Sequence, residues 1–173
     1  MSHVKFAFSS RYQQGFEGVW ETMPYVVAAF LVPIVLGFLP GIANQLLVGT
    51  IVNFLLAYCA LNASGSRLKL LPLIIVPSIG AYVSGIIFGA QTAALLYFIL
   101  PIWMANAAYV WLIKGKGLVF SSIAKSGILF ASAGALVLSG FVPAAFLLAM
   151  GPIQFATALA GGFAATKAVG FKA

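Results

Sequence analysis

The chain has 173 residues, of which 63% are hydrophobic and 6% are charged, and its formal net charge is +7. A soluble domain carries about 25% charged residues because its surface faces water. This composition therefore excludes an ordinary soluble domain and predicts an integral membrane protein. The basic residues form no patch with interleaved aromatic side chains, so nucleic-acid binding is not expected.

Six apolar stretches are suited to crossing a bilayer, for which a helix needs roughly 20 predominantly apolar residues. In chain order they cover residues 24–39, 42–61, 68–88, 92–113, 118–138 and 142–166. Residues 1–23 precede the first stretch, and we expect them to form a cytoplasmic and interfacial segment. The sequence thus predicts an all-α polytopic membrane protein, with one six-helix transmembrane domain over residues 1–173.

The basic residues alternate with these six stretches. Eight of the nine fall before the first stretch or after the second, fourth and sixth: Lys5, Arg11, Arg67, Lys69, Lys114, Lys116, Lys167 and Lys172. The other connections carry no charge. Because cytoplasmic loops are enriched in Lys and Arg, we expect both termini to be cytoplasmic, in a multi-pass protein of the cell membrane surrounded by lipid.

Small residues recur at four-residue spacing on three of the stretches, which places each set on one helix face. The sets are Ala81, Gly85 and Gly89; Gly127, Ala131, Ala135 and Ser139; and Ala156, Ala160, Ala164 and Ala168. In lipid, helices associate through close backbone approach at small residues. These faces indicate packing inside the bundle or docking of a partner membrane protein, for which the first and third sets are the candidates.

Several polar side chains lie inside the apolar stretches. Asn53, Asn106 and Gln154 carry amides, and an unpaired amide in hydrocarbon costs several kcal/mol, so all three should point inward. They either bridge helices or line a substrate pocket with Trp103, which shares a face with Asn106, and with Tyr109. At the charge-free end, Asn44, Gln45 and Gln91 are suited to binding a neutral or zwitterionic ligand.

Lys125 is the one basic residue deep inside an apolar stretch, about seven residues from its basic end. Two interpretations are open. Its aliphatic stem can carry the ammonium group back to the interface, or the ammonium group contacts an anionic group or a bound partner.

The chain lacks the residues of most catalytic sites. Glu17 and Glu21 are its only carboxylate side chains, His3 its only histidine and Cys59 its only cysteine. No catalytic triad, carboxylate pair or metal-ligand cluster can be assembled from these residues, and no intramembrane proton relay. We therefore expect no enzyme activity, no metal and no cofactor, and no ability to power transport unaided.

Three segments resemble stretches of a known family: QLLVGTIVNFLLAYCAL (residues 45–61), VPSIGAYVSGIIFG (76–89) and YFILPIWMANAAYVWLIKGKG (97–117). The chain is similar in these segments, in its size and in its expected topology to the substrate-binding S component of energy-coupling factor transporters, in a poorly characterised branch. The resemblance implies capture of a micronutrient at the outer face. It also implies association with a transmembrane coupling subunit and two cytoplasmic ATPases.

One family feature is missing. Members often carry an Ala-x-x-x-Ala surface on the first span for docking, whereas here Ala28 and Ala29 are followed four positions later by Val32 and Pro33. The metal-binding branch of the family is also disfavoured, since His and Cys ligands are nearly absent.

The favoured hypothesis is a membrane-embedded substrate-binding subunit of an ATP-driven importer for a vitamin-like molecule. The alternative is a structural or assembly subunit of a larger membrane complex. A passive channel is third, because it requires a continuous polar path and the inner halves of the stretches contain few polar residues.

Overall fold

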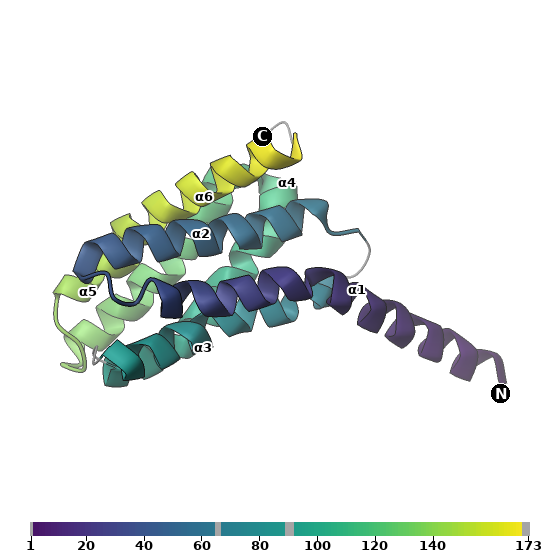
Figure 1. Ribbon diagram of the computed structural model, residues 1–173, viewed down its shortest axis with the longest axis horizontal. Coiled ribbons are helices and arrows are strands. Elements are labelled where there is room, and N and C mark those ends of the chain that lie inside the picture. The colour runs from purple at the N-terminus through teal and green to yellow at the C-terminus, as the bar shows by residue number, and fades with distance from the viewer. Residues whose placement is uncertain (1, 65–66, 89–91, 171–173) are drawn as a thin grey trace.

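The computed structural model describes residues 2–64, 67–88 and 92–170, with side chains from residue 19 onward except at 92–94. These residues form helices and connections without a strand, as the composition predicts (Figure 1). The elements are α1 (Ser2–Val35), α2 (Gly41–Asn62), a 3₁₀ turn (Arg67–Leu70), α3 (Leu71–Phe88), α4 (Thr92–Leu138), α5 (Ala145–Leu148), a π-helical turn (Ala149–Ile153) and α6 (Gln154–Val169).

Four helical runs within the described residues are long and apolar enough to cross a membrane. They are Gly41–Asn62, Arg67–Phe88, Leu95–Leu138 and Ala145–Val169, and a shorter apolar run covers Val19–Val35. The chain is therefore an all-α membrane protein. Helix α1 begins at Ser2, well before the predicted start at residue 24, and its N-terminal part extends away from the other helices (Figure 1).

Helix α4 is two helical arms joined at Gly117. Gly117 has φ 80° and ψ 172°, a conformation outside the helical region that glycine adopts without steric cost. In a straight helix Asn106 and Lys125 would lie about 28 Å apart, yet their side chains are hydrogen-bonded. The chain therefore folds back at Gly117, and residues 92–116 pack against residues 118–138, as the two separate stretches in the sequence predict.

Close helix crossings occur at glycines. A methyl group added to Gly80 on α3 would overlap the backbone carbonyl oxygen of Phe30 on α1. A methyl group added to Gly161 on α6 would overlap the backbone of Thr50 and Phe54 on α2. Because lipid provides no hydrophobic drive between helices, such backbone approach is a main source of their association. Helices α2 and α6 accordingly run side by side along the bundle (Figure 1).

The three small-residue faces lie in different surroundings. Gly85 is buried and lines an internal cavity together with Ala81, so this face is turned into the bundle, while Gly89 lies outside the described residues. Ala156, Ala160 and Ala164 are exposed on the outside of α6. The remaining set, on the second arm of α4, is exposed at all four positions: Gly127, Ala131, Ala135 and Ser139.

We expect Gly80→Ala to lower the free energy of unfolding by about 1–3 kcal/mol, the usual cost of overpacking a tight contact. The matched control is Gly127→Ala, since a methyl group at Gly127 meets no atom within 4 Å. Alanine there should leave stability unchanged or raise it by up to about 1 kcal/mol, because glycine weakens a helix interior. Unfolding in micelles titrated with SDS measures both, and equal effects would contradict the α1–α3 crossing.

Arg67, Lys69 and Lys114 lie at one end of the bundle, which we call the basic end. There Arg67 donates a hydrogen bond to the carbonyl oxygen of Trp111 at 2.6 Å, and Lys114 donates to that of Ala63 at 2.6 Å. Lys69 lies 3.7 Å from the carboxylate of Glu21. The charge-free connections between α1 and α2 and between α4 and α5 lie at the opposite end.

Candidate ligand-binding cavity

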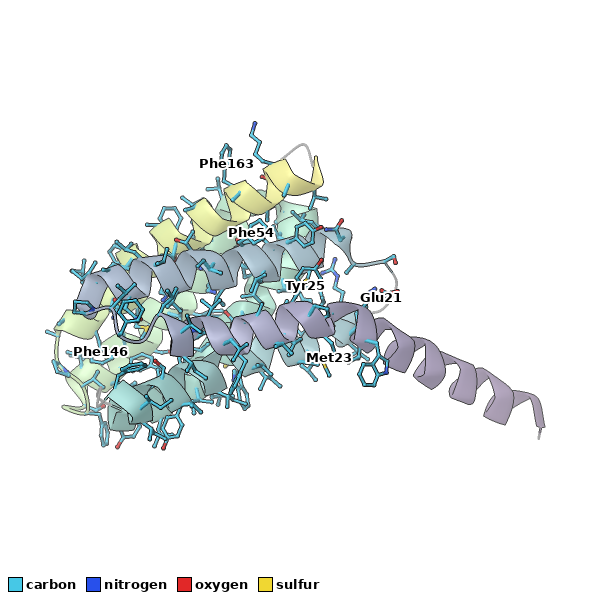
Figure 2. The ribbon with its side chains drawn as sticks, viewed as in Figure 1. Glu21, Met23, Tyr25, Phe54, Phe146 and Phe163 are labelled. Carbon is cyan, nitrogen blue, oxygen red and sulfur yellow. The ribbon has the colours of Figure 1, made fainter. Side chains whose placement is uncertain are left out.

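A cavity of about 410 Å³ enters the bundle from the end opposite the basic end. It is bordered near that end by Leu39, Gly41, Asn44, Gln45 and Phe146. Figure 2 shows Phe146 at this end of the bundle and Glu21 near the other. Along α2 the lining continues from Gly41 to Asn53, which corresponds to a depth of about 18 Å at 1.5 Å per residue.

The side walls of the cavity are mainly apolar. Val48 and Val52 come from α2, Ile102 and Leu129 from the two arms of α4, and Met150 from the π-helical turn. Polar groups on the walls are the hydroxyls of Ser78 and Ser84 on α3 and the amide of Gln154 on α6. Apolar walls with a few placed polar groups are typical of small-molecule sites.

Lys125 closes the inner end of the cavity. Its ammonium nitrogen donates hydrogen bonds to Oδ1 of Asn53 and, at 2.7 Å, to Oδ1 of Asn106. The three residues are 3%, 1% and 2% exposed, respectively, and all three line the cavity. A cation and two amides from α2 and both arms of α4 therefore meet deep inside the bundle.

The amide orientations are held by further contacts. Asn106 donates through Nδ2 to the carbonyl oxygen of Ile74 at 3.0 Å, and Asn53 donates through Nδ2 to Oγ1 of Thr157 at 3.3 Å. Each amide thus turns its oxygen toward Lys125 and its nitrogen toward a neighbouring helix. The Nζ of Lys125 also lies 5.4 Å from the ring centroid of Tyr109, within the range of a cation–π contact.

Snorkelling, one of the two interpretations of Lys125, is wrong. The stem does not carry the ammonium group to the interface, because both side-chain hydrogen bonds are made inside the bundle and the residue is 3% exposed. Within the described part of the chain Lys125 has no carboxylate partner, and Glu21 is placed beside Lys69.

Five of the residues predicted to bind substrate are brought together: Asn44, Gln45, Asn53, Asn106 and Gln154 line the cavity. Asn44 also donates to the carbonyl oxygen of Leu36 at 2.7 Å, which ties the α1–α2 connection to the start of α2. The inward orientation expected for the amides of Asn53 and Asn106 is thus found, and they both bridge helices and border the cavity.

Trp103 and Tyr109 were expected to line the pocket, but they pack behind it. The Trp103 indole donates to Oγ of Ser78 at 2.8 Å, and the Tyr109 hydroxyl donates to the carbonyl oxygen of Ala158 at 2.8 Å. Neither borders the cavity. Asn106 points into the cavity, whereas the indole nitrogen of Trp103 reaches α3 and the hydroxyl of Tyr109 reaches α6. Gln91 lies outside the described residues.

Comparisons of the chain with protein-family models, curated proteins and solved structures gave no match. The functional inference therefore depends on the cavity and its contacts.

Three polar residues of the site were not singled out from the sequence. Ser78 and Ser84 lie on the cavity-facing side of α3, and Thr157 accepts the hydrogen bond from Asn53. A signal was present for each, since hydroxyls within an apolar span need an internal partner. Ser78 follows Pro77, and Thr157 is three residues after Gln154, on the same helix face.

The start of α6 is widened by the π-helical turn Ala149–Ile153, which contains Pro152. A π-helical turn leaves room for a residue that cannot donate a backbone hydrogen bond, and such turns are frequent at functional sites. Ala149 and Met150 of this turn line the cavity, as does Gln154, which directly follows the turn.

The residues at the closed end of the cavity are suited to binding a small molecule. Among the side chains that the structure describes, no group of three His, Cys, Asp or Glu residues comes together as a metal site. The closed end instead offers hydrogen-bond donors and acceptors beneath apolar walls, which is an arrangement for holding a small molecule.

Proposed function

We propose that the chain is the membrane-embedded substrate-binding subunit of an ATP-driven importer for a vitamin-like small molecule. The observation that carries the proposal is the cavity, which runs from the charge-free end of the bundle to Lys125 and is closed there. A pocket that is open toward one end suits capture of a ligand from one side of a membrane.

The proposed orientation places the cavity toward the outside of the cell. Cytoplasmic segments of membrane proteins are rich in Lys and Arg, and Arg67, Lys69 and Lys114 lie at the end away from the mouth of the cavity. In this arrangement six helices cross the cell membrane, with the two arms of α4 as the fourth and fifth, and both termini are cytoplasmic. The fold-back at Gly117 supports this topology.

The energy for transport is proposed to come from a transmembrane coupling subunit and cytoplasmic ATPases, because the sequence contains neither a phosphate-binding loop nor intramembrane carboxylates. The resemblance to S components of energy-coupling factor transporters supports this division of labour. For docking of the coupling subunit, the exposed face Ala156, Ala160 and Ala164 of α6 is the remaining candidate, since Ala81 and Gly85 face the cavity.

A structural or assembly subunit is the second candidate. The exposed small-residue faces of α6 and of the second α4 arm favour it, because they permit close packing of a neighbouring membrane protein. It offers no reason, however, for a cavity of about 410 Å³ with a buried cation at its end.

The proposal is tested by native mass spectrometry of the full chain, gently purified from its own cells together with any bound proteins. We expect a retained small molecule, and copurification of a coupling subunit and ATPases. The variant Ala81→Phe fills the cavity and should lose the small molecule, whereas Ala131→Phe, on an exposed face of α4, should retain it. Isolation with neither ligand nor ATPases, or in a stable complex that lacks ATPases, would contradict the proposal.

A further inference from the structure

The closed end of the cavity contains a buried positive charge that the described residues leave without a counter-ion. A charge taken out of water is costly unless it is paired or well hydrogen-bonded. Lys125 contacts two neutral amide oxygens and one aromatic ring, and Glu21 is engaged by Lys69 at the other end of the bundle. The ammonium group of Lys125 thus favours binding of an anion at this end of the cavity.

The hydrogen-bond inventory points the same way. An ammonium group has three N–H donors, and the contacts of Lys125 with Asn53 and Asn106 use two of them. Each asparagine also uses one of its two amide N–H donors, Asn53 toward Thr157 and Asn106 toward the Ile74 carbonyl. At the closed end, donors therefore remain on Lys125 and on the two amides, all of which border the cavity, and Lys125 is the residue among them that can carry a positive charge.

We propose that this end of the cavity is a subsite for the carboxylate of the ligand, which binds the ammonium group of Lys125. The inference rests on the proposed function and names the class of its substrate: a monocarboxylate with an apolar body. The body lies between Val52, Ile102 and Leu129, which flank the closed end.

The charge count favours a carboxylate over a phosphate. Sites for phosphate dianions gather several cationic or backbone donors around three oxygens, whereas here the cation is the single ammonium of Lys125. A monoanion matches that charge. The volume of about 410 Å³ falls within the range of about 300–1,000 Å³ that is typical of small-molecule pockets.

The test uses the full chain in nanodiscs of zwitterionic lipid, so that no anionic lipid competes for Lys125. The probes are hexanoate, benzoate and phenylbutyrate, each at millimolar concentration beside its own amide and beside inorganic phosphate. We expect the carboxylates, but neither the amides nor phosphate, to raise the Tm followed by tryptophan fluorescence. Stabilisation by the amides to the same degree, or by none of the carboxylates, would overturn the carboxylate subsite.

Two variants separate the charge from the hydrogen bonds. Lys125→Gln retains donors for the two asparagine oxygens and removes the charge, and Lys125→Met removes both. We expect Lys125→Gln to fold and to weaken carboxylate binding by at least about 30-fold, while Lys114→Gln at the basic end leaves binding unchanged. If Lys125→Gln binds the carboxylates as the unmodified chain does, Lys125 is a structural residue and the inference fails.

The failure of this inference can be told apart from failure of the proposed function. A molecule that copurifies with the chain but carries no acidic group would overturn the carboxylate subsite and leave the importer subunit in place. A chain that is stabilised by carboxylates but isolated in a stable complex without ATPases would support the carboxylate subsite and overturn the proposed importer subunit.

Discussion

Asn106→Leu is expected to lower the free energy of unfolding by about 2–3 kcal/mol. The substitution removes an acceptor from a buried ammonium group and leaves the carbonyl oxygen of Ile74 without its donor, and hydrogen bonds to charged groups contribute about 1.5–3 kcal/mol. Leucine is apolar and of similar size, so a loss of hydrophobic packing is not the cause. SDS titration of the micellar protein measures the effect.

The effect of Asn106→Leu should depend on Lys125. In a Lys125→Met background there is no buried charge to leave unpaired, so the same substitution should cost much less than in the unmodified chain. Asn62→Leu is the matched control, because the Asn62 amide is exposed and bonds only its own helix, through the carbonyl oxygen of Tyr58. Additive losses in the double variant would show that Asn106 and Lys125 are not energetically coupled.

Gly161→Leu is expected to prevent the normal association of α2 and α6. A side chain at Gly161 would overlap backbone atoms of Thr50 and Phe54 and approach Cβ of Asn53 to 2.9 Å. Backbone atoms cannot move away as a flexible side chain can. Even Gly161→Ala should therefore lower the free energy of unfolding by about 3 kcal/mol, the upper part of the range for overpacking. The leucine variant should cost more and yield little monodisperse protein on size-exclusion chromatography.

The same substitution should also impair ligand binding. Asn53 lies at this crossing and holds Lys125, so a shift of α2 away from α6 displaces one of its two side-chain hydrogen-bond acceptors. Ala164→Leu is the size-matched control, since Ala164 is exposed on α6 about one turn further along. If both variants purify and unfold alike, the α2–α6 crossing is not as described.

The sequence predicts the helices well because the signals for them are local. The stretches at residues 42–61 and 68–88 match α2 and the run Arg67–Phe88 within one residue at each end. Pro40 and Gly41 end one apolar run and begin the next, and Gly115 and Gly117 among lysines mark a break in another. The start of α1 was missed, because residues 2–23 are too polar to be read as a spanning segment yet continue the same helix.

The candidate site was predicted in part. Amides inside an apolar stretch must face inward, and this rule located Asn53, Asn106 and Gln154, which line the cavity. It could not separate Trp103 and Tyr109 from them, since three-residue spacing places side chains on one face without saying which neighbour each tip reaches. Their donors are taken by Ser78 and by the Ala158 carbonyl.

The sequence alone was enough to predict a membrane protein and to predict that its basic residues lie toward one end of the bundle. Both predictions depend on hydropathy and charge spacing, which can be read directly along the chain. Only the tertiary structure ruled out snorkelling of Lys125 and showed that its ammonium group contacts two neutral amides inside the bundle. A lysine in an apolar helix can reach the interface or turn inward, and the choice depends on whether acceptors from other helices lie within reach. Here Asn53, 72 residues away, and Asn106, 19 residues away, supply them, and they do so only because the crossing at Gly161 and the fold-back at Gly117 bring three helical segments together.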